Sequence, residues 1–211
     1  MFIVHHLNNS RSQRVLWLLE ELGLDYEIRH YKRNLDMSAP DEMKRIHPLG
    51  KSPIVGVIDD SCRMTLVETG AICEYLVESA NGRLGAPGDC ESSQRYRQFL
   101  HYAEGSIMPL LFALLVVSKI PLLGVIAARK IRPMLDLHLD YVERELSERR
   151  WFAGDTFTAA DVMMSFPLEA AAKWSGRNAN RPATSDWLKR IHARDAFARA
   201  LQKGGQYVLA R

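Results

Sequence analysis

The chain has 211 residues, of which 47% are hydrophobic and 25% charged, and its formal net charge at pH 7 is +3. This length is enough for two modest domains with a buried core, and the composition excludes a disordered or low-complexity chain. The charge is too mild to indicate a nucleic-acid-binding protein.

The first 31 residues predict a β-α-β unit. Phe2–His6 and Asp25–Tyr31 are expected to be strands, and the segment from Ser12 to Leu22 has apolar residues at helical spacing and is ended by Gly23. Because the helix carries the chain back to the same end of the sheet, the two strands should pair in parallel.

Residues 33–49 predict irregular structure with one short helix. Two further strands, Pro53–Ile58 and Met64–Val67, flank a predicted hairpin turn at residues 59–61. A helix from Glu68 to about Ser79 closes this first domain. Residues 81–88 are rich in helix breakers, so we place the domain boundary near residue 82.

The second half predicts an all-helical domain. Phe157, Thr158, Asp161 and Val162 have the spacing of a capping box with a hydrophobic staple, which indicates a folding role. The helices are expected near residues 91–117, 122–149, 158–174 and 183–202.

One apolar segment, Ile107 to Ala128, could be mistaken for a membrane span. Lys119 and Pro121 interrupt it, and a lysine near the middle of a span costs about 3 kcal/mol on insertion scales. We therefore expect two buried bundle helices here and no membrane span, and peripheral contact of residues 107–128 with a membrane is the less favoured alternative. The N-terminus does not resemble a signal peptide.

The cysteines and the C-terminal cations have no spacing that indicates a binding site. Cys62, Cys73 and Cys90 have neither the spacing of a zinc site nor that of a disulfide framework, so no metal is expected, and a reducing compartment fits best. Cations exceed acids after residue 180, and a solvated helix face is the expected reason.

Two short motifs indicate a binding site. Pro53 lacks a backbone donor and suits the first position of a strand, X-Pro bonds can be cis, and the backbone of Ser52 is left free to pair with a peptide. Glu68 and Thr69, at a helix start, offer an acceptor for an ammonium group and a donor-rich terminus for a carboxylate. Glutathione carries both charges at its γ-glutamyl end. The alternative is a simple strand start and helix cap.

These motifs, in this order and spacing, resemble the glutathione S-transferase family, and the resemblance covers nearly the whole chain. It implies a thioredoxin-like α/β domain over residues 1–82 that binds glutathione, followed by an all-α helical bundle over residues 90–211 that supplies the electrophile site. It also implies a cytoplasmic homodimer. The segments Ser10–Arg14 and Trp17–Leu22 are similar to those of bacterial and fungal members.

The resemblance places thiol activation in the turn after the first strand, where the family keeps a Tyr, Ser or Cys. Ser10 stands four residues before Arg14, as in serine-type members, so Ser10 is the predicted donor to the glutathione thiolate, with Asn9 and Ser12 as rivals. Lys51 could pair with the glycyl carboxylate. His5 and His6 point to opposite faces of a strand and are expected to be sheet or core residues.

The expected activity is conjugation of glutathione to small hydrophobic electrophiles. No cysteine lies in the turn, and disulfide exchange through a protein thiol would need one. A glutathione-dependent peroxidase or isomerase, and a non-catalytic binding or regulatory protein, remain as alternatives. By position, the electrophile site would lie between the turn and the inner helices of the second domain, with candidate lining residues Tyr102, Ser106, Met108 and Leu111.

Overall fold

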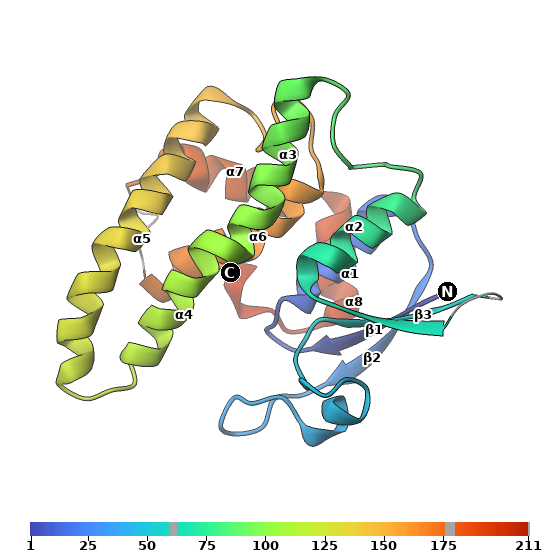
Figure 1. Ribbon diagram of the computed structural model, residues 1–211, viewed down its shortest axis with the longest axis horizontal. Helices are drawn as coiled ribbons and strands as arrows, with labels where there is room; N and C mark the ends of the chain where they lie inside the picture. Colours follow the sequence, from blue (N-terminus) through green and yellow to red (C-terminus); the bar gives the residue numbers. More distant parts are fainter. Residues whose placement is uncertain (60–62, 176–179, 211) are drawn as a thin grey trace. The chain divides into compact units, whose positions relative to one another are not determined.

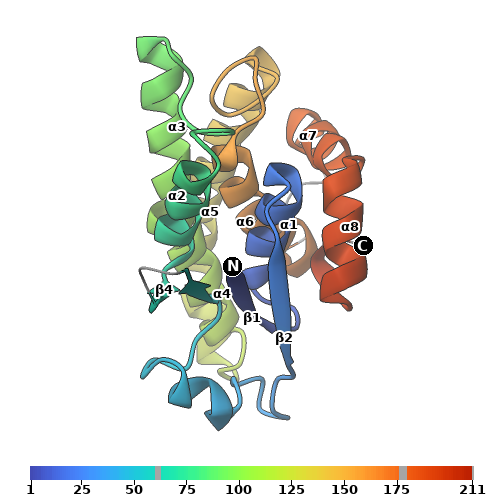
Figure 2. The same ribbon diagram turned by 90° about the vertical axis from the view of Figure 1, so that its right-hand side faces the viewer.

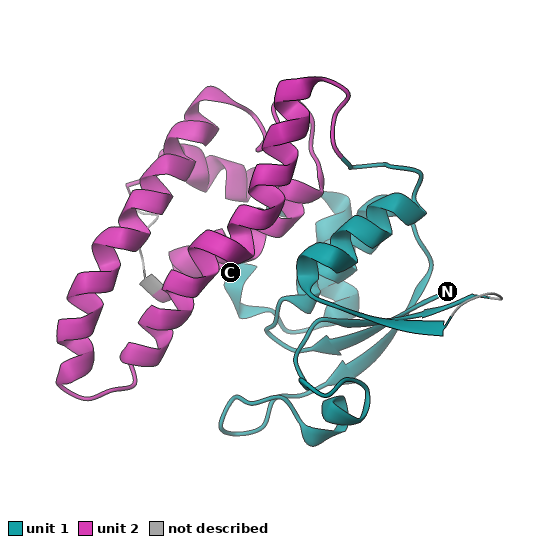
Figure 3. Ribbon diagram, viewed as in Figure 1, with its two compact units in different colours: residues 1–85, 192–211 teal, residues 86–191 magenta. Residues whose placement is uncertain are grey.

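The computed structural model describes residues 1–59, 63–175 and 180–210. The chain folds into two compact units, residues 1–85 with 192–211, and residues 86–191 (Figure 3). The predicted boundary near residue 82 stays a prediction. The C-terminal segment belongs to the same unit as the sheet, whereas the sequence predicts it as part of the helical domain.

The first unit contains a four-stranded mixed sheet in the order β2-β1-β3-β4. Strand β1 (Phe2–Leu7) pairs in parallel with β2 (Tyr26–Tyr31) and antiparallel with β3 (Ile54–Ile58), which pairs antiparallel with β4 (Arg63–Val67). The expected parallel crossover is therefore confirmed. The turn predicted between β3 and β4 falls mostly at residues 60–62, together with Cys62, outside the described residues.

Helices α1 (Ser12–Leu22) and α2 (Thr69–Ser79) cover one face of this sheet (Figure 1). Residues Val15 to Leu19 are completely buried, and Gly23 ends α1 in the left-handed conformation (φ 60°) that glycine adopts at little cost. A short 3₁₀ helix, η1 (Asp41–Arg45), confirms the helix expected within residues 33–49.

The second unit is helical, as predicted. Its first helix is continuous through α3 (Cys90–Tyr102), a π-helical turn η2 (Ala103–Ile107) and α4 (Met108–Val117). It is followed by α5 (Leu123–Glu148), α6 (Ala159–Ser175) and α7 (Pro182–His192). The π turn was not predicted; such turns are rare and occur often at functional sites.

Half of the predicted capping box is present at the start of α6, where the Asp161 side chain reaches back to the Thr158 backbone N–H. Asp161 Oδ2 accepts hydrogen bonds from Thr158 N at 3.0 Å and Thr158 Oγ1 at 3.3 Å, while Oδ1 accepts from Phe152 N at 3.1 Å and Trp187 Nε1 at 3.2 Å. Burial raises the pKa of Asp161 to about 6, against the lowering effect of these hydrogen bonds. This carboxyl group joins three separate segments of the helical unit.

The helix predicted over residues 183–202 is instead two helices, α7 and α8 (Asp195–Gly204), separated at an extended Arg194. Figure 2 shows α8 beside α1, and the Phe197 ring packs edge-on against Trp17 at 5.1 Å. The break lies next to the point where the chain passes from the helical unit into the first unit. The short η3 (Val208–Ala210) follows.

The C-terminal cations form the predicted solvated face only in part: Lys189, Arg199 and Lys203 are exposed, but several of the cations also pair with acids on α1. Arg194 forms hydrogen bonds to both carboxylate oxygens of Glu21, and Glu20 accepts from Arg199 at 2.8 Å and Lys203 at 2.5 Å. These cations are neutralised by acids on α1 that lie at least 173 residues away in the sequence. Sequence proximity could not show this pairing.

The segment from Ile107 to Ala128 forms two helical ends as expected, but the prediction that they are buried is wrong. Large apolar side chains at the end of α4 and the start of α5 are exposed. By length and composition alone, the continuous helix Cys90–Val117 could cross a membrane. Only 28% of its most apolar 18-residue window is buried.

Candidate active site

The turn between β1 and α1 gathers serine hydroxyls from two segments. Ser10 Oγ lies 2.8 Å from Ser12 Oγ and 3.0 Å from Ser52 Oγ, although Ser10 and Ser52 are 42 residues apart. The Ser52–Pro53 peptide bond is cis, and Pro53 is buried directly before β3. The tertiary structure thus brings the predicted activating serine to the predicted peptide-binding turn.

Ser10 is almost buried, with 4% of its surface exposed, and its oxygen already accepts a hydrogen bond from Ser12 N at 3.3 Å. An acceptor role is therefore partly filled, which leaves the hydroxyl hydrogen as the group that Ser10 can offer to a ligand. The nearby N-terminus of α1 adds partial positive charge on the same side.

The two rivals of Ser10 have other partners. Asn9 is in the left-handed region (φ 50°), and its Oδ1 accepts a hydrogen bond from Val208 N at 2.9 Å. Ser12 is completely buried, and its Oγ lies 2.8 Å from His6 Nδ1 and donates weakly to Leu7 O at 3.4 Å. Of the three side chains, Ser10 is the one placed at the Ser52 turn.

His6 orders this hydroxyl chain, a role that the sequence did not indicate. It is buried, and desolvation lowers its pKa to about 4, with a further lowering by His30 and an opposing effect of a backbone hydrogen bond with Gly204. The ring is therefore neutral at pH 7. If Nε2 carries the proton toward Gly204, Nδ1 accepts a hydrogen bond from the Ser12 hydroxyl.

The polarity of the chain follows from that assignment. With the Ser12 hydrogen directed at His6 Nδ1 at 2.8 Å, and not at the more distant Leu7 O at 3.4 Å, the 2.8 Å contact between the two serines uses the Ser10 hydrogen. Ser12 Oγ and an incoming thiolate would then compete for that hydrogen. Alternation along the strand indicated only that His6 faces one side of the sheet; the partner across the turn could not be read from it.

The second predicted motif lies at the start of α2. Thr69 is buried and accepts a hydrogen bond from the buried Arg14 guanidinium, Nη2 to Oγ1, at 3.5 Å. The cation and the helix N-terminus together create positive potential that suits a carboxylate. Arg14 was predicted only as a marker for Ser10, so its position beside Thr69 is new.

Glu68, just before Thr69, is exposed and has a backbone φ of 69°. Positive φ is costly for a residue with a side chain and is concentrated at ligand-binding and active sites. Its carboxylate forms no ion pair with any residue in the described ranges, and it can accept hydrogen bonds from an ammonium group. Lys51 is also exposed, next to Ser52.

The candidates for the electrophile site lie in the helical unit. Tyr102 is half-buried and Ser106 lies in the π turn, whereas Met108 and Leu111 are buried. Tyr102 Oη is 2.5 Å from His138 Nδ1, and burial raises the pKa of Tyr102 to about 12. Tyr102 is therefore a neutral hydroxyl at pH 7.

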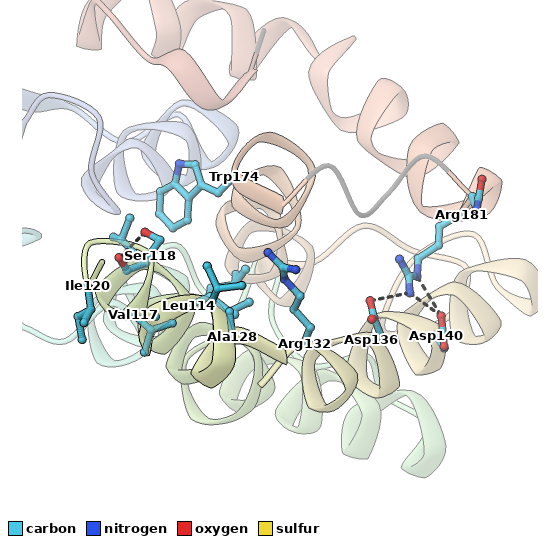
Figure 4. Close-up of a pocket in the computed structure, with 15 residues that line it drawn as sticks. Leu114, Val117, Ser118, Ile120, Ala128, Arg132, Asp136, Asp140, Trp174 and Arg181 are labelled. Atoms are coloured by element: carbon cyan, nitrogen blue, oxygen red, sulfur yellow. Dashed lines mark hydrogen bonds and ion pairs between the residues drawn. The ribbon is translucent and has the colours of Figure 1, made fainter. Parts of the chain in front are cut away.

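A cavity of about 1030 Å³ opens within the helical unit, and Leu111 lines it (Figure 4). Leu114, Ala128 and Trp174 form an apolar part of its wall. At the other end Arg181 binds Asp140 at 2.6 Å and Asp136 at 3.5 Å. The cavity therefore offers apolar contacts at one end and a neutralised ion cluster at the other.

Among the residues that the structure describes, no group of three or more His, Cys, Asp or Glu side chains is placed so that it could hold a metal ion. Cys73 is buried in α2, and Cys90 is exposed at the start of α3.

Comparison with known proteins agrees with this arrangement. Residues 1–78 match the family model "Glutathione S-transferase, N-terminal domain", and residues 126–195 match "Glutathione S-transferase, C-terminal domain". "Glutathione S-transferase 3" of Schizosaccharomyces pombe is 34% identical, over 96% of this chain and 88% of that protein. "Glutathione S-transferase 1" of Saccharomyces cerevisiae is also 34% identical, over 95% and 94%.

A solved structure is similar over the full length. A glutathione S-transferase from Actinobacillus pleuropneumoniae has a TM-score of 0.87 and 32% identity, covering 100% of this chain and 96% of that one. Both family models, the identity and the fold agree, and this chain therefore belongs to the glutathione S-transferase family.

Proposed function

We propose that this protein is a glutathione transferase that activates the glutathione thiol with Ser10 and conjugates it to small hydrophobic electrophiles. The observation that carries the proposal is the 3.0 Å contact between Ser10 Oγ and Ser52 Oγ. It brings the candidate thiol donor to the turn that would pair with the glutathione backbone.

Each end of glutathione has a proposed partner. The cysteinyl backbone pairs with Ser52 beside Pro53, and the thiolate accepts a hydrogen bond from Ser10. The γ-glutamyl ammonium is bound by Glu68 and its carboxylate by the start of α2 at Thr69, where the buried Arg14 supports negative charge. Lys51 pairs with the glycyl carboxylate.

The helical domain supplies the electrophile site. Support comes from the cavity that Leu111 and Trp174 line, since apolar walls with a few polar groups are typical of small-molecule sites. Tyr102 and Ser106 offer hydroxyl groups near the π turn. The proposed biological unit is a cytoplasmic homodimer, with domains at residues 1–82 and 90–211.

The deciding experiment is a titration of the purified protein with glutathione at several pH values, following the ultraviolet absorbance of the thiolate. A saturable signal with a thiol pKa well below about 8.5 supports binding and activation. Binding with an unshifted pKa would favour a non-catalytic glutathione-binding protein. No binding would overturn the assignment of Ser52, Glu68 and Thr69. An electrophile panel with a hydroperoxide arm then separates transferase from peroxidase.

A further inference from the structure

The turn between α4 and α5 presents apolar side chains that neither the helical core nor the cavity uses. We define the α4–α5 tip as Phe112, Val116, Leu122, Leu123 and Ile126, all of which are exposed and none of which lines the cavity. Leu122 is 86% exposed, Leu123 69% and Phe112 59%. The tip lies at the end of the bundle opposite the start of α3 (Figure 1).

The backbone adds a second observation at the apex. Leu122 has φ 59° and ψ −65°, and Leu123 N donates to Pro121 O at 2.7 Å, which is a γ-turn with positive φ that a leucine adopts only at a cost and that glycine would adopt more easily. An 86% exposed side chain gains little from packing inside the protein. Neither local conformation nor folding stability accounts for a leucine here, and a contiguous exposed apolar patch is typical of an interaction site.

The charges around the tip indicate what that partner is. Between Glu104 and Asp136 the chain has four cations, Lys119, Arg129, Lys130 and Arg132, and no acidic residue. All four are exposed, although Arg132 also lines the cavity, and none forms an ion pair with a residue that the structure describes. Because the whole chain has a formal charge of +3 and this segment +4, the rest of the chain sums to −1.

Apolar side chains with basic residues just behind them fit the surface of an anionic phospholipid bilayer. The leucines and the phenylalanine would enter the boundary between headgroups and acyl chains, and the cations would meet lipid phosphate and carboxylate groups. A second copy meeting the same tip face to face would oppose one set of cations with another, which disfavours self-association there.

We propose that the α4–α5 tip docks this protein on anionic membrane surfaces. The contact is peripheral, because the helices that carry the tip belong to the folded bundle. Buried residues Leu111, Ala128 and Leu135 anchor α4 and α5 in that bundle. The proposal does not depend on the activity proposed for the serine site.

The test is vesicle flotation of the full chain with phosphatidylcholine vesicles alone and with vesicles containing about a third phosphatidylserine. We expect binding to the phosphatidylserine vesicles that weakens with added salt, and little binding to phosphatidylcholine alone. The double variant Leu122→Asn/Leu123→Gln should lose binding, and its fold should survive because both side chains are exposed and contribute little packing.

Charge is tested separately with Arg129→Gln/Lys130→Gln. Removing two surface cations should weaken partitioning onto anionic vesicles about 30-fold. Matched controls are Leu137→Gln, an equally exposed leucine about four turns further along α5, and Arg97→Gln, an exposed cation on α3. Both controls should bind as the unaltered protein does. Circular dichroism and thermal unfolding of every variant confirm folding.

The proposal is overturned if the folded protein does not bind phosphatidylserine vesicles, or if the tip variants bind as well as the controls. Analytical ultracentrifugation tests whether a second copy of this chain, and not a membrane, covers the tip. If the unaltered chain ignores vesicles while the tip double variant breaks up an oligomer, the tip is an interface between copies of this chain and the membrane proposal is wrong.

Discussion

Exchange of Ser12 for alanine tests the hydroxyl chain most directly, because the structure predicts opposite effects for two neighbouring serines. The Ser10 hydrogen is shared between Ser12 Oγ, at 2.8 Å, and any thiolate that arrives. Ser12→Ala removes the competing acceptor, so Ser10 can donate to the thiolate alone. Ser10→Ala removes the donor itself.

The magnitudes follow from hydrogen-bond strengths. A hydrogen bond to a charged group contributes about 1.5–3 kcal/mol, so Ser10→Ala should raise the pKa of the bound thiol by about 1–2 units and lower kcat/KM about 10- to 100-fold. A neutral competing hydrogen bond contributes about 0.5–1.5 kcal/mol, so Ser12→Ala should lower that pKa by up to about 1 unit. Stability should fall in Ser12→Ala by about 1–3 kcal/mol, because His6 Nδ1 is left buried without its donor.

The assay is thiolate absorbance against pH at saturating glutathione, with urea unfolding of the same samples. Asn9→Ala is the control, since its Oδ1 is bonded to Val208 N and the thiol pKa should not change. A rise in the thiol pKa in Ser12→Ala, with none in Ser10→Ala, would refute the reasoning and make Ser12 the donor. A rise in both would show that the serine pair acts together and that the competition is not real.

Three further predictions concern the ligand site and the folded core. Glu68→Gln should weaken glutathione binding about tenfold with little change in kcat, because the partner of the ammonium group is lost while Ser10 is unchanged. Calorimetric titration and steady-state kinetics measure the two quantities. A fall in kcat without weaker binding would contradict the prediction. Although desolvation by burial raises the pKa of Glu20, hydrogen bonds from Lys203, Tyr26 and Arg199 lower it to about 2. The ionised Glu20 should therefore stabilise the fold fully above about pH 4.5, and this stability should be lost as the pH falls toward about 2. Urea unfolding measured against pH should show a loss of about 1–2 kcal/mol over this range, after solvent screening. The Glu20→Gln variant should not show this loss. Asp161→Asn should destabilise the protein by about 2–4 kcal/mol, because both carboxyl oxygens accept hydrogen bonds and an amide nitrogen cannot; an unfolding midpoint equal to that of the unaltered protein would show that the four bonds carry no net stability.

Local chemistry made much of this fold predictable. The apolar spacing of α1, the alternation in β2 and the breakers before α3 each depend on neighbours in sequence, so their positions agree with the structure to within one or two residues. The capping box at Thr158 and Asp161 was equally visible. The further partners of Asp161, Phe152 N and Trp187 Nε1, were not, because they come from other segments.

One prediction failed and a second was incomplete, because both treated exposure as a property of the local sequence. The apolar segment around Ile120 was expected to be buried, yet burial depends on whether another element covers it, and none of the described elements does so at Leu122. The C-terminal cations were expected to be simply solvated; Arg199 and Lys203 are exposed, yet they and Arg194 pair with Glu20 and Glu21 because α8 packs on α1.

The candidate site divides in the same way. Residue type and order alone indicated Ser10, Ser52, Pro53, Glu68 and Thr69, because a turn before a helix, an X-Pro step and a helix start each have their own chemistry. Only the tertiary structure decided that Ser10 and Ser52 are 3.0 Å apart, that His6 accepts the Ser12 hydroxyl and that Arg14 reaches Thr69. Hydrogen bonds act over about 3 Å, and those between residues 42 or 55 positions apart exist only once the sheet has brought their strands and helices together.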